Sequence, residues 1–247
     1  MSIKVLGRYK AGAPELIEKA SQETIQRGAP VFFHDDFLGY KLNKYIANEN
    51  TVAPWHTVVT NSPTSAPLLV ANAAGGVAQM ALAVTNEAER SVLYMGDQLP
   101  FDITMGLIWE CRAAFHVLTD VAAGIIVLGL ASADNATADT IASNLWFRLE
   151  GASANILWES DDNVTNDDDN DTGVDAVADE YHIFRIDCTI PTTPLFYIDG
   201  NLVGTASAAF VAAGTGAVQP YFAVEKASGA SVGTLYVDDV KVWQNRA

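Results

Sequence analysis

The stretch EYHIFRIDC, residues 180–188, decides the fold class of this chain. Its side chains alternate between two faces, as they do along a β-strand. One face is apolar apart from one histidine, and it carries His182, Phe184, Ile186 and Cys188. The other face carries Tyr181, Arg185 and Asp187. This period of two predicts a half-buried strand, with His182 as a hydrogen-bonded core residue rather than a ligand or a base.

One hairpin is predicted on each side of this strand. Asp199-Gly200 lies between short apolar runs, and both residue types tolerate the positive φ values of a tight hairpin turn. A four-residue loop at 151–154 would place Phe147 opposite Trp158 in the other hairpin. One face of that hairpin is then apolar, which indicates antiparallel strands with one buried face.

The same texture continues through the chain from Val31 onward. Short β-branched and aromatic runs alternate there with Gly, Asn, Asp and Ser, without a repeat of fixed period. At least eleven strands are indicated, near 31–37, 56–60, 67–71, 77–84, 90–95, 105–117, 124–131, 144–150, 155–160, 181–188, 195–205, 217–225 and 233–243. Many short strands without a repeat predict an all-β antiparallel sandwich.

Residues 1–30 differ from the rest and are predicted to form an arm. Pro14 can occupy the first turn of a helix, and apolar residues follow at helical spacing as far as Ile25, before Gly28 and Pro30. We therefore expect one helix over 14–26 within the arm, and a single domain over 31–247. Such a short helix is marginal in water unless other parts of the structure support it.

The distribution of charge also separates residues 1–30 from the rest of the chain. Of the 247 residues, 49% are hydrophobic and 18% charged, which excludes a disordered chain. The formal net charge is -16, and residues 1–30 carry +2, so the remainder carries the difference, -18. A body this acidic repels nucleic acid and anionic membranes, so neither is an expected partner.

Targeting and redox signals are sparse. The basic residues near the start are followed by Ala11 to Pro14 instead of an apolar core, so no secretory signal is expected and synthesis is cytoplasmic. The apolar run at 122–131 is far shorter than the roughly 20 residues of a membrane-spanning helix. Cys111 and Cys188 leave two alternatives, buried free thiols or one disulfide.

Three motifs carry a family resemblance: ADEYHIFRID at 178–187, FYIDG at 196–200 and LYVDDVKV at 235–242. Together they resemble the concanavalin-like, laminin-G-like jelly rolls, and the resemblance covers about residues 31–245. It implies two antiparallel sheets, one of them concave. It also implies roles that range from sugar binding to capsid decoration, among which the fold cannot choose.

Within that superfamily, the Ala-, Thr- and Asn-rich loops and the short arm before FFHDDF at 32–37 resemble tailed-phage structural proteins. This resemblance implies a non-enzymatic decoration protein on the capsid surface of a virion. Its arm would bind the major capsid protein or another virion protein, or a sister subunit in a homo-oligomer, for which we expect a trimer. The alternative is a tail or fibre adhesin that binds host polysaccharide.

No catalytic residue is predicted. Some relatives with this fold hydrolyse β-glucans with a Glu-x-Asp-x-x-Glu strand motif, which is absent here. The nearest pair, Glu150 and Glu159, would share a face about four residues apart, or roughly 13 Å. Glycosidase carboxylates lie about 5 to 9.5 Å apart, so hydrolysis is not expected. Trp146, opposite the core face, is the preferred candidate for stacking on a sugar.

Metals and cofactors are not predicted either. His34, His56 and His116 stand singly, without the spacing of a zinc site, and no phosphate-binding loop is present. The acidic segment 161–179 has two interpretations. Counted from Asp168, its oxygen-bearing residues partly match a calcium loop that ends at Asp179. A solvated acidic loop is the preferred interpretation, because Asp replaces the bidentate Glu and strands flank the segment.

Overall fold

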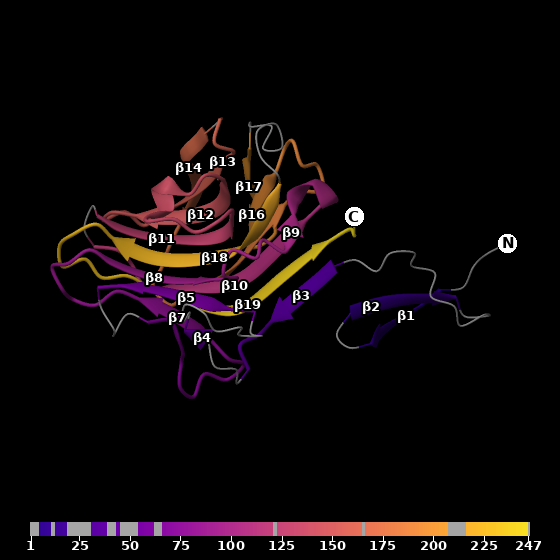
Figure 1. Cartoon of the computed structure of the whole chain (residues 1–247), viewed down its shortest axis with the longest axis horizontal. Coiled ribbons are helices and arrows are strands. Elements are labelled where there is room, and N and C mark those ends of the chain that lie inside the picture. The colour runs from indigo at the N-terminus through magenta and orange to yellow at the C-terminus, as the bar shows by residue number, and fades with distance from the viewer. Residues whose placement is uncertain are drawn as a thin grey trace.

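The computed structural model describes residues 31–38, 54–61, 66–120, 123–164, 166–206 and 216–246. It also gives the backbone of three further strands: β1 (Val5–Lys10), β2 (Ala13–Glu18) and β4 (Asn43–Lys44). Two sheets, antiparallel except for the β4–β5 pair, pack face to face (Figure 1). This arrangement confirms the predicted all-β sandwich. Among the described residues, no helix is long and apolar enough to cross a membrane.

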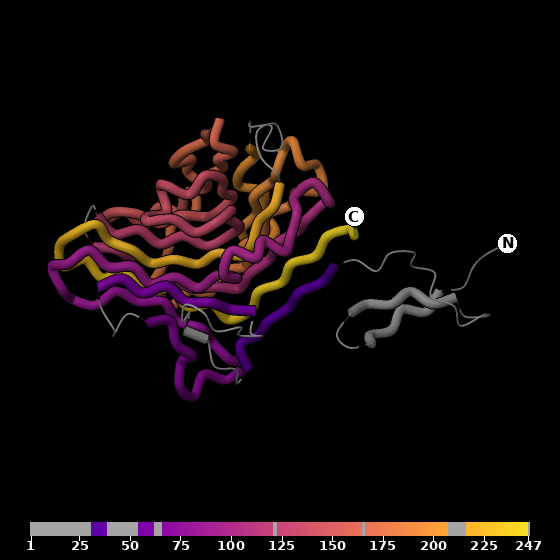
Figure 2. The backbone as a smooth tube through the Cα atoms, in the orientation of Figure 1, coloured from indigo at the N-terminus to yellow at the C-terminus, as the bar shows by residue number. Residues whose placement is uncertain are grey.

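The first sheet contains eight strands. In spatial order they are β17 (Asn201–Thr205), β16 (Leu195–Ile198), β15 (Tyr181–Asp187), β10 (Ile108–Val117), β19 (Thr234–Gln244), β7 (Ala78–Ala81) and β6 (Leu68–Leu69), with β3 (Val31–Asp35) also pairing with β19. One half of β19 pairs with β7 and the other half with β3. Strands from the two ends of the sequence therefore lie side by side (Figure 2).

The second sheet contains nine strands. In spatial order they are β14 (Asn166–Asp175), β13 (Asn155–Asp161), β12 (Asn144–Glu150), β11 (Gly124–Ala131), β18 (Ala217–Lys226), β8 (Glu89–Tyr94), β5 (His56–Thr60) and β4, with β9 (Phe101–Asp102) pairing at the start of β18. Its central strands are apolar on both faces, as expected for strands that are covered on both sides.

The main core lies between the two sheets. Phe147 of β12 contacts Phe184 of β15 with ring centroids 5.0 Å apart, and Phe196 of β16 at 5.5 Å. These three rings are fully buried and join the sheets. Burying a phenylalanine side chain contributes about 1.5 to 3 kcal/mol. Aromatic contacts of this kind hold the sandwich together.

The strand that decided the fold class is confirmed as β15. His182, Phe184, Ile186 and Cys188 are buried, while their neighbours on the strand are more exposed. The Nδ1 atom of His182 lies 2.7 Å from Oδ2 of Asp199, so this histidine is a hydrogen-bonded core residue.

Both predicted hairpins form. Asp199 and Gly200 have φ values of 51° and 79°, as the tight turn between β16 and β17 requires. In the other hairpin Phe147 pairs with Trp158, so the predicted register is confirmed. Cys111 and Cys188 are buried free thiols, and burial raises the pKa of both.

The arm differs from its prediction. Residues 14–18 lie in β2, which pairs antiparallel with β1, so the helix predicted over 14–26 is wrong there. Residues 19–26 lie outside the described residues. A short isolated helix is marginal in water, and pairing with β1 gives the backbone of β2 hydrogen-bond partners instead.

The acidic segment 161–179 also differs from its predicted conformation. Residues 166–175 of the expected loop form β14, an edge strand that pairs with β13. The preferred solvated-loop interpretation is therefore wrong for these ten residues, although most of their side chains are exposed. The residues of the calcium-loop pattern are not gathered around one point, because Asp168 accepts a hydrogen bond from Asn166 within β14, whereas Asp179 contacts His116.

Candidate functional site

The candidate site lies on the outer face of the nine-stranded sheet, the face turned away from the main core. Alternate residues of adjacent strands point to this face because side chains alternate along a strand. The residues that define it are Arg90, Val92, Tyr94, Val127, Trp146, Arg148, Glu150, Glu159, Tyr221, Ala223 and Glu225. They include a buried arginine on each of β8 and β12.

A loop covers the middle of this outer face. Residues 132–143 connect β11 to β12 and contain η3 (Ala138–Thr140). Ala138 and Ile141 are buried against Tyr94, Trp146 and Tyr221, in an apolar cluster separate from the main core. The nine-stranded sheet is therefore packed on both faces, with the loop as the outer layer.

Trp146 shows what this layer does. The indole lies opposite the main core, as its register predicted, but it is 0% exposed. Its Nε1 donates a hydrogen bond to Glu159. A ring without an exposed face cannot stack on a sugar, so the prediction of Trp146 as a stacking platform is wrong.

Arg90 fixes one end of the loop. Its Nε donates to Glu225 at 3.0 Å, and its two terminal nitrogens donate to Asp134 at 3.1 and 2.5 Å. The second oxygen of Glu225 accepts the backbone N–H of Ala138 at 2.9 Å. Burial disfavours the charge on Arg90, but its hydrogen bond to Asp134 and the nearby carboxylates outweigh burial and raise its pKa. Burial raises the pKa of Glu225 as well.

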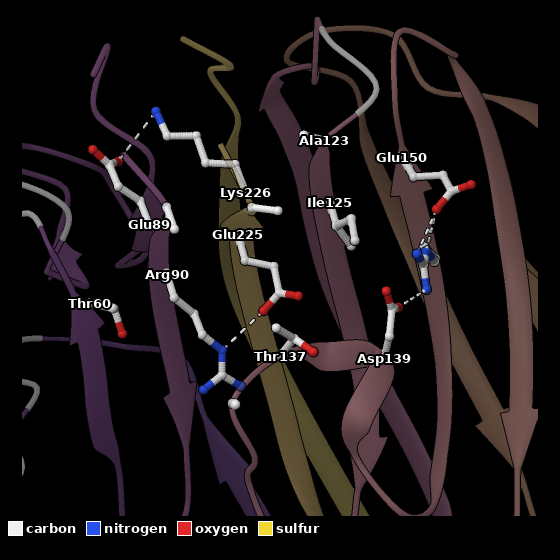
Figure 3. Close-up of a pocket in the computed structure, with 14 residues that line it drawn as sticks. Thr60, Glu89, Arg90, Ala123, Ile125, Thr137, Asp139, Glu150, Glu225 and Lys226 are labelled. Carbon is white, nitrogen blue, oxygen red and sulfur yellow. Dashed lines mark hydrogen bonds and ion pairs between the residues drawn. The ribbon is translucent and has the colours of Figure 1, made fainter. Parts of the chain in front are cut away.

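Arg148 fixes the other end. Its guanidinium contacts Asp139 of the loop at 2.7 Å, Glu150 at 2.6 Å and Glu159 at 3.0 Å. Figure 3 shows Glu150 and Asp139 approaching the same guanidinium. We call the Asp139–Arg148 contact the bridge, because it joins the loop to the sheet. Three carboxylates share this one cation.

The contacts of Arg148 correct the expected distance between Glu150 and Glu159. Both carboxylates contact one guanidinium, so they lie much closer together than the 13 Å expected from strand rise. Distance no longer argues against acid–base chemistry between them. The guanidinium of Arg148 argues against such chemistry, because each carboxylate would have to break an ion pair before it could attack a sugar or protonate a leaving group.

Glu159 is the most perturbed acid on this face. It is 3% exposed, and burial raises its pKa to about 7 against the opposing effects of Arg148 and Trp146, while Asp169 raises the pKa further. In the pairing of β13 with β14, Glu159 stands opposite two residues, Asp168 and Asp169, which form a β-bulge. Asp169 has a φ of 50° there. Bulges redirect side chains in this way next to binding sites.

Two hollows flank the bridge, and both include Asp139 and Arg148. The first, the paired pocket, has a volume of about 380 Å³ and is drawn in Figure 3. Besides Arg148, its cations are Arg90, which contacts Glu225, and Lys226, whose Nζ lies 3.8 Å from Glu89. Each cation in this pocket therefore has a carboxylate partner.

The second hollow, the acidic pocket, has a volume of about 260 Å³. Five carboxyl groups line it, against the single guanidinium of Arg148. They belong to Asp139, Glu159, Asp161, Asp168 and Asp169. Burial also raises the pKa of Asp161. Among the described residues, no group of three histidine, cysteine or acidic side chains is arranged to hold a metal ion.

Of the histidines considered from the sequence, His56 lies on this face, opposite Tyr94 of β8 with ring centroids 6.3 Å apart. His34 and His116 are separate from it: His34 contacts Asp239 at 2.7 Å, and His116 contacts Asp179 at 2.5 Å. Sequence reasoning missed Arg90, Arg148 and Glu225. The available signal was a charged residue next to a strongly apolar run, as at Arg148 after Leu145, Trp146 and Phe147, because a buried charge needs a partner.

No family model matches the chain, and no curated protein matches it. An endo-1,3-β-glucanase from Streptomyces sioyaensis superposes with a TM-score of 0.58 at 15% identity, over 92% of this chain and 100% of that one. A protein of unknown function from Shewanella oneidensis gives 0.58 at 12% identity, over 91% and 92%. A structure from work on endo-acting O-glycanases of the human gut microbiota gives 0.60 at 12% identity, over 87% and 99%.

Likeness at such identities defines the fold and nothing finer. The chain has the concanavalin A-like jelly-roll fold, a β-sandwich shared with β-glucanases, as the sequence motifs implied. The same fold carries many unrelated functions, so function has to be argued from the site.

Proposed function

We propose that this chain is a non-enzymatic structural protein of a virion, a decoration protein that attaches to the capsid surface through its N-terminal arm. The observation that supports a passive role is the covered outer face. An endo-acting hydrolase has to seat a polymer in an open groove beside free acid and base groups. Here residues 132–143 pack on that face, and Arg148 pairs with the acids beside it.

The arm supports attachment. Residues 1–30 carry +2 on a chain whose remainder carries -18. Among the strands that the structure describes, β1 and β2 pair with each other and with none of the others. A basic segment of this kind can order on the major capsid protein, another virion protein or a sister subunit. In a symmetric homo-oligomer such as a trimer, several arms would add their affinities.

An attachment assay on capsid shells tests this proposal. We expect the triple variant Lys4→Glu, Arg8→Glu, Lys10→Glu to lose at least tenfold in shell affinity in a pelleting assay, because its arm becomes acidic. Deletion of residues 1–27 should abolish attachment and leave a soluble domain. The control is Lys241→Glu, which reverses one cation of the sandwich. Undiminished attachment of the triple variant would overturn the role of the arm.

The alternative function is a tail or fibre adhesin that binds host polysaccharide, and the acidic pocket favours it. A concave site lined by acceptors suits hydroxylated ligands. The distinguishing experiment is a glycan array with the full-length protein, followed by incubation with each glycan that binds. The adhesin proposal requires binding without cleavage, and release of shorter products would contradict both proposals.

A further inference from the structure

We propose that the outer face of the eight-stranded sheet binds the same face of a second copy of this chain. This inference goes beyond the proposed function, which places attachment in the arm and gives this face no role. We call the surface the aromatic face. It consists of the side chains of β3, β6, β10, β15, β16, β17 and β19 that point away from the main core, among them Tyr181, Tyr197 and Trp243.

Exposed apolar side chains mark this face. Among the described residues, three large hydrophobic side chains are exposed within strands: Leu68, Ile183 and Leu202, at 44%, 45% and 56%. All three lie on the aromatic face, because their neighbours along each strand pack in the main core. On the nine-stranded sheet, residues 132–143 cover the outer apolar side chains. The aromatic face therefore exposes side chains of the kind that the other sheet covers.

A row of mostly apolar side chains crosses the middle of the aromatic face. The register of β16, β15, β10, β19 and β3 aligns Leu195, Asp187, Ile108, Trp243 and Phe32. Asp187 is the single charged residue of this row, and its side chain is only 12% exposed. Because neighbouring strands lie about 4.8 Å apart, the row is a strip about 19 Å long. Such a strip can form the apolar centre of an interface.

The rings on this face favour a protein partner over a sugar. The guanidinium of Arg185 lies 5.8 Å from the ring centroid of Tyr197 and 6.0 Å from that of Trp243. The guanidinium of Arg112 lies 4.1 Å from the ring centroid of Tyr181. A sugar stacks on a free ring face, and these rings already contact cations. Tyrosine, tryptophan and arginine are the residues that dominate the centres of protein–protein interfaces.

The balance of charge favours a second copy as that protein. The charged residues of β10, β15 and β19 are three cations and four carboxylates, a formal charge of -1, whereas residues 31–247 carry -18. Two acidic copies repel each other least where the surfaces in contact are nearly neutral. The cations are all paired within the face, as Arg112–Asp238, Arg185–Asp187 and Lys241–Asp239, with Glu110 also beside Lys241.

The size of the aromatic face suits a dimer. Five strands about 4.8 Å apart, of about the length of the seven-residue β15, cover about 550 Å². Contact between two such faces covers about 1,100 Å² in total, just above the roughly 1,000 Å² of a specific interface. Because each copy contributes the same surface, the assembly closes at two copies.

Sedimentation equilibrium of the full-length protein tests this proposal. We expect the mass of two copies at about 10 to 100 μM, because an interface of this size associates weakly. Ile183→Lys should raise the dissociation constant about tenfold or more, since the contact would then bury an ammonium group. The side chain of Ile183 is 45% exposed, so the variant should fold, and circular dichroism checks this. Leu202→Lys repeats the test at a second exposed position if Ile183→Lys does not fold.

The matched control is Val164→Lys, which adds the same charge on the other sheet. Val164 is 77% exposed and lies between β13 and β14. We expect this variant to leave the dissociation constant unchanged. Equal weakening by Ile183→Lys and Val164→Lys would show a general effect of charge and overturn the assignment.

The outcomes also separate this inference from the proposed function. The triple arm variant Lys4→Glu, Arg8→Glu, Lys10→Glu should remain dimeric, and its loss of the dimer would place the contact in the arm and overturn the inference. A monomer at every concentration, or an oligomer of any order that Ile183→Lys leaves intact, also overturns it, while the pelleting assay still decides attachment. If a glycan binds the monomer and Ile183→Lys abolishes that binding, the face is a sugar site and the inference fails.

Discussion

The paired pocket and the acidic pocket lie on the same sheet face, on either side of the bridge, and differ in their charge. In the paired pocket, each of the cations Arg90, Arg148 and Lys226 has a carboxylate partner. In the acidic pocket, five carboxyl groups share Arg148 alone. In the paired pocket the removal of one partner would leave a buried charge uncompensated, whereas in the acidic pocket the carboxyl groups already outnumber the cation.

The largest effect should come from Arg148, the residue common to both pockets. Arg148→Met leaves Glu159 buried without its cation and releases Asp139, so the free energy of unfolding should fall by about 3 to 5 kcal/mol. Urea denaturation measures this loss. Arg112→Met is the control, because Arg112 pairs with Asp238 on the other sheet while 46% exposed, and should lose less than about 1 kcal/mol. Equal losses would mean that the bridge is an ordinary surface pair.

A smaller effect should distinguish the acidic pocket by its response to pH. Glu159 has a pKa of about 7 against an ordinary 4.5, so between these values the folded state holds a proton that the unfolded state releases. The stabilisation is complete below pH 4.5 and is lost as pH rises to about 7, by at most about 3 kcal/mol. Glu159→Gln should remove this dependence when unfolding is measured from pH 4.5 to 8, and Glu180→Gln should preserve it. An unchanged slope in Glu159→Gln would contradict the assignment to Glu159.

The sequence predicted the features that depend on local alternation. His182 was expected in the core because apolar residues recur every second position around it, and the structure confirms it there. The pairing of Phe147 with Trp158 followed from the length of one turn. Such features are set by the period of a strand and the geometry of its turn, and both can be read from neighbouring residues.

Features that depend on distant contacts could not be predicted in this way. The outer layer is made by Arg90 with Asp134 and by Ala138 with Glu225, pairs that lie 44 and 87 residues apart. Nothing local in residues 132–143 indicates the sheet face that they cover. The acidic run in β14 was interpreted as a loop, because its strand depends on pairing with β13. Tertiary pairing overrides a composition typical of loops.

Hydrogen–deuterium exchange of residues 132–143 in the free, full-length protein tests the central claim most directly, since that claim is a covered outer face. The account predicts that the amide of Ala138, which donates to buried Glu225, exchanges at least about a hundredfold more slowly than an unprotected amide. Exchange of Ala138 at the unprotected rate would mean that the loop leaves the sheet and opens a groove, which would contradict a passive outer face.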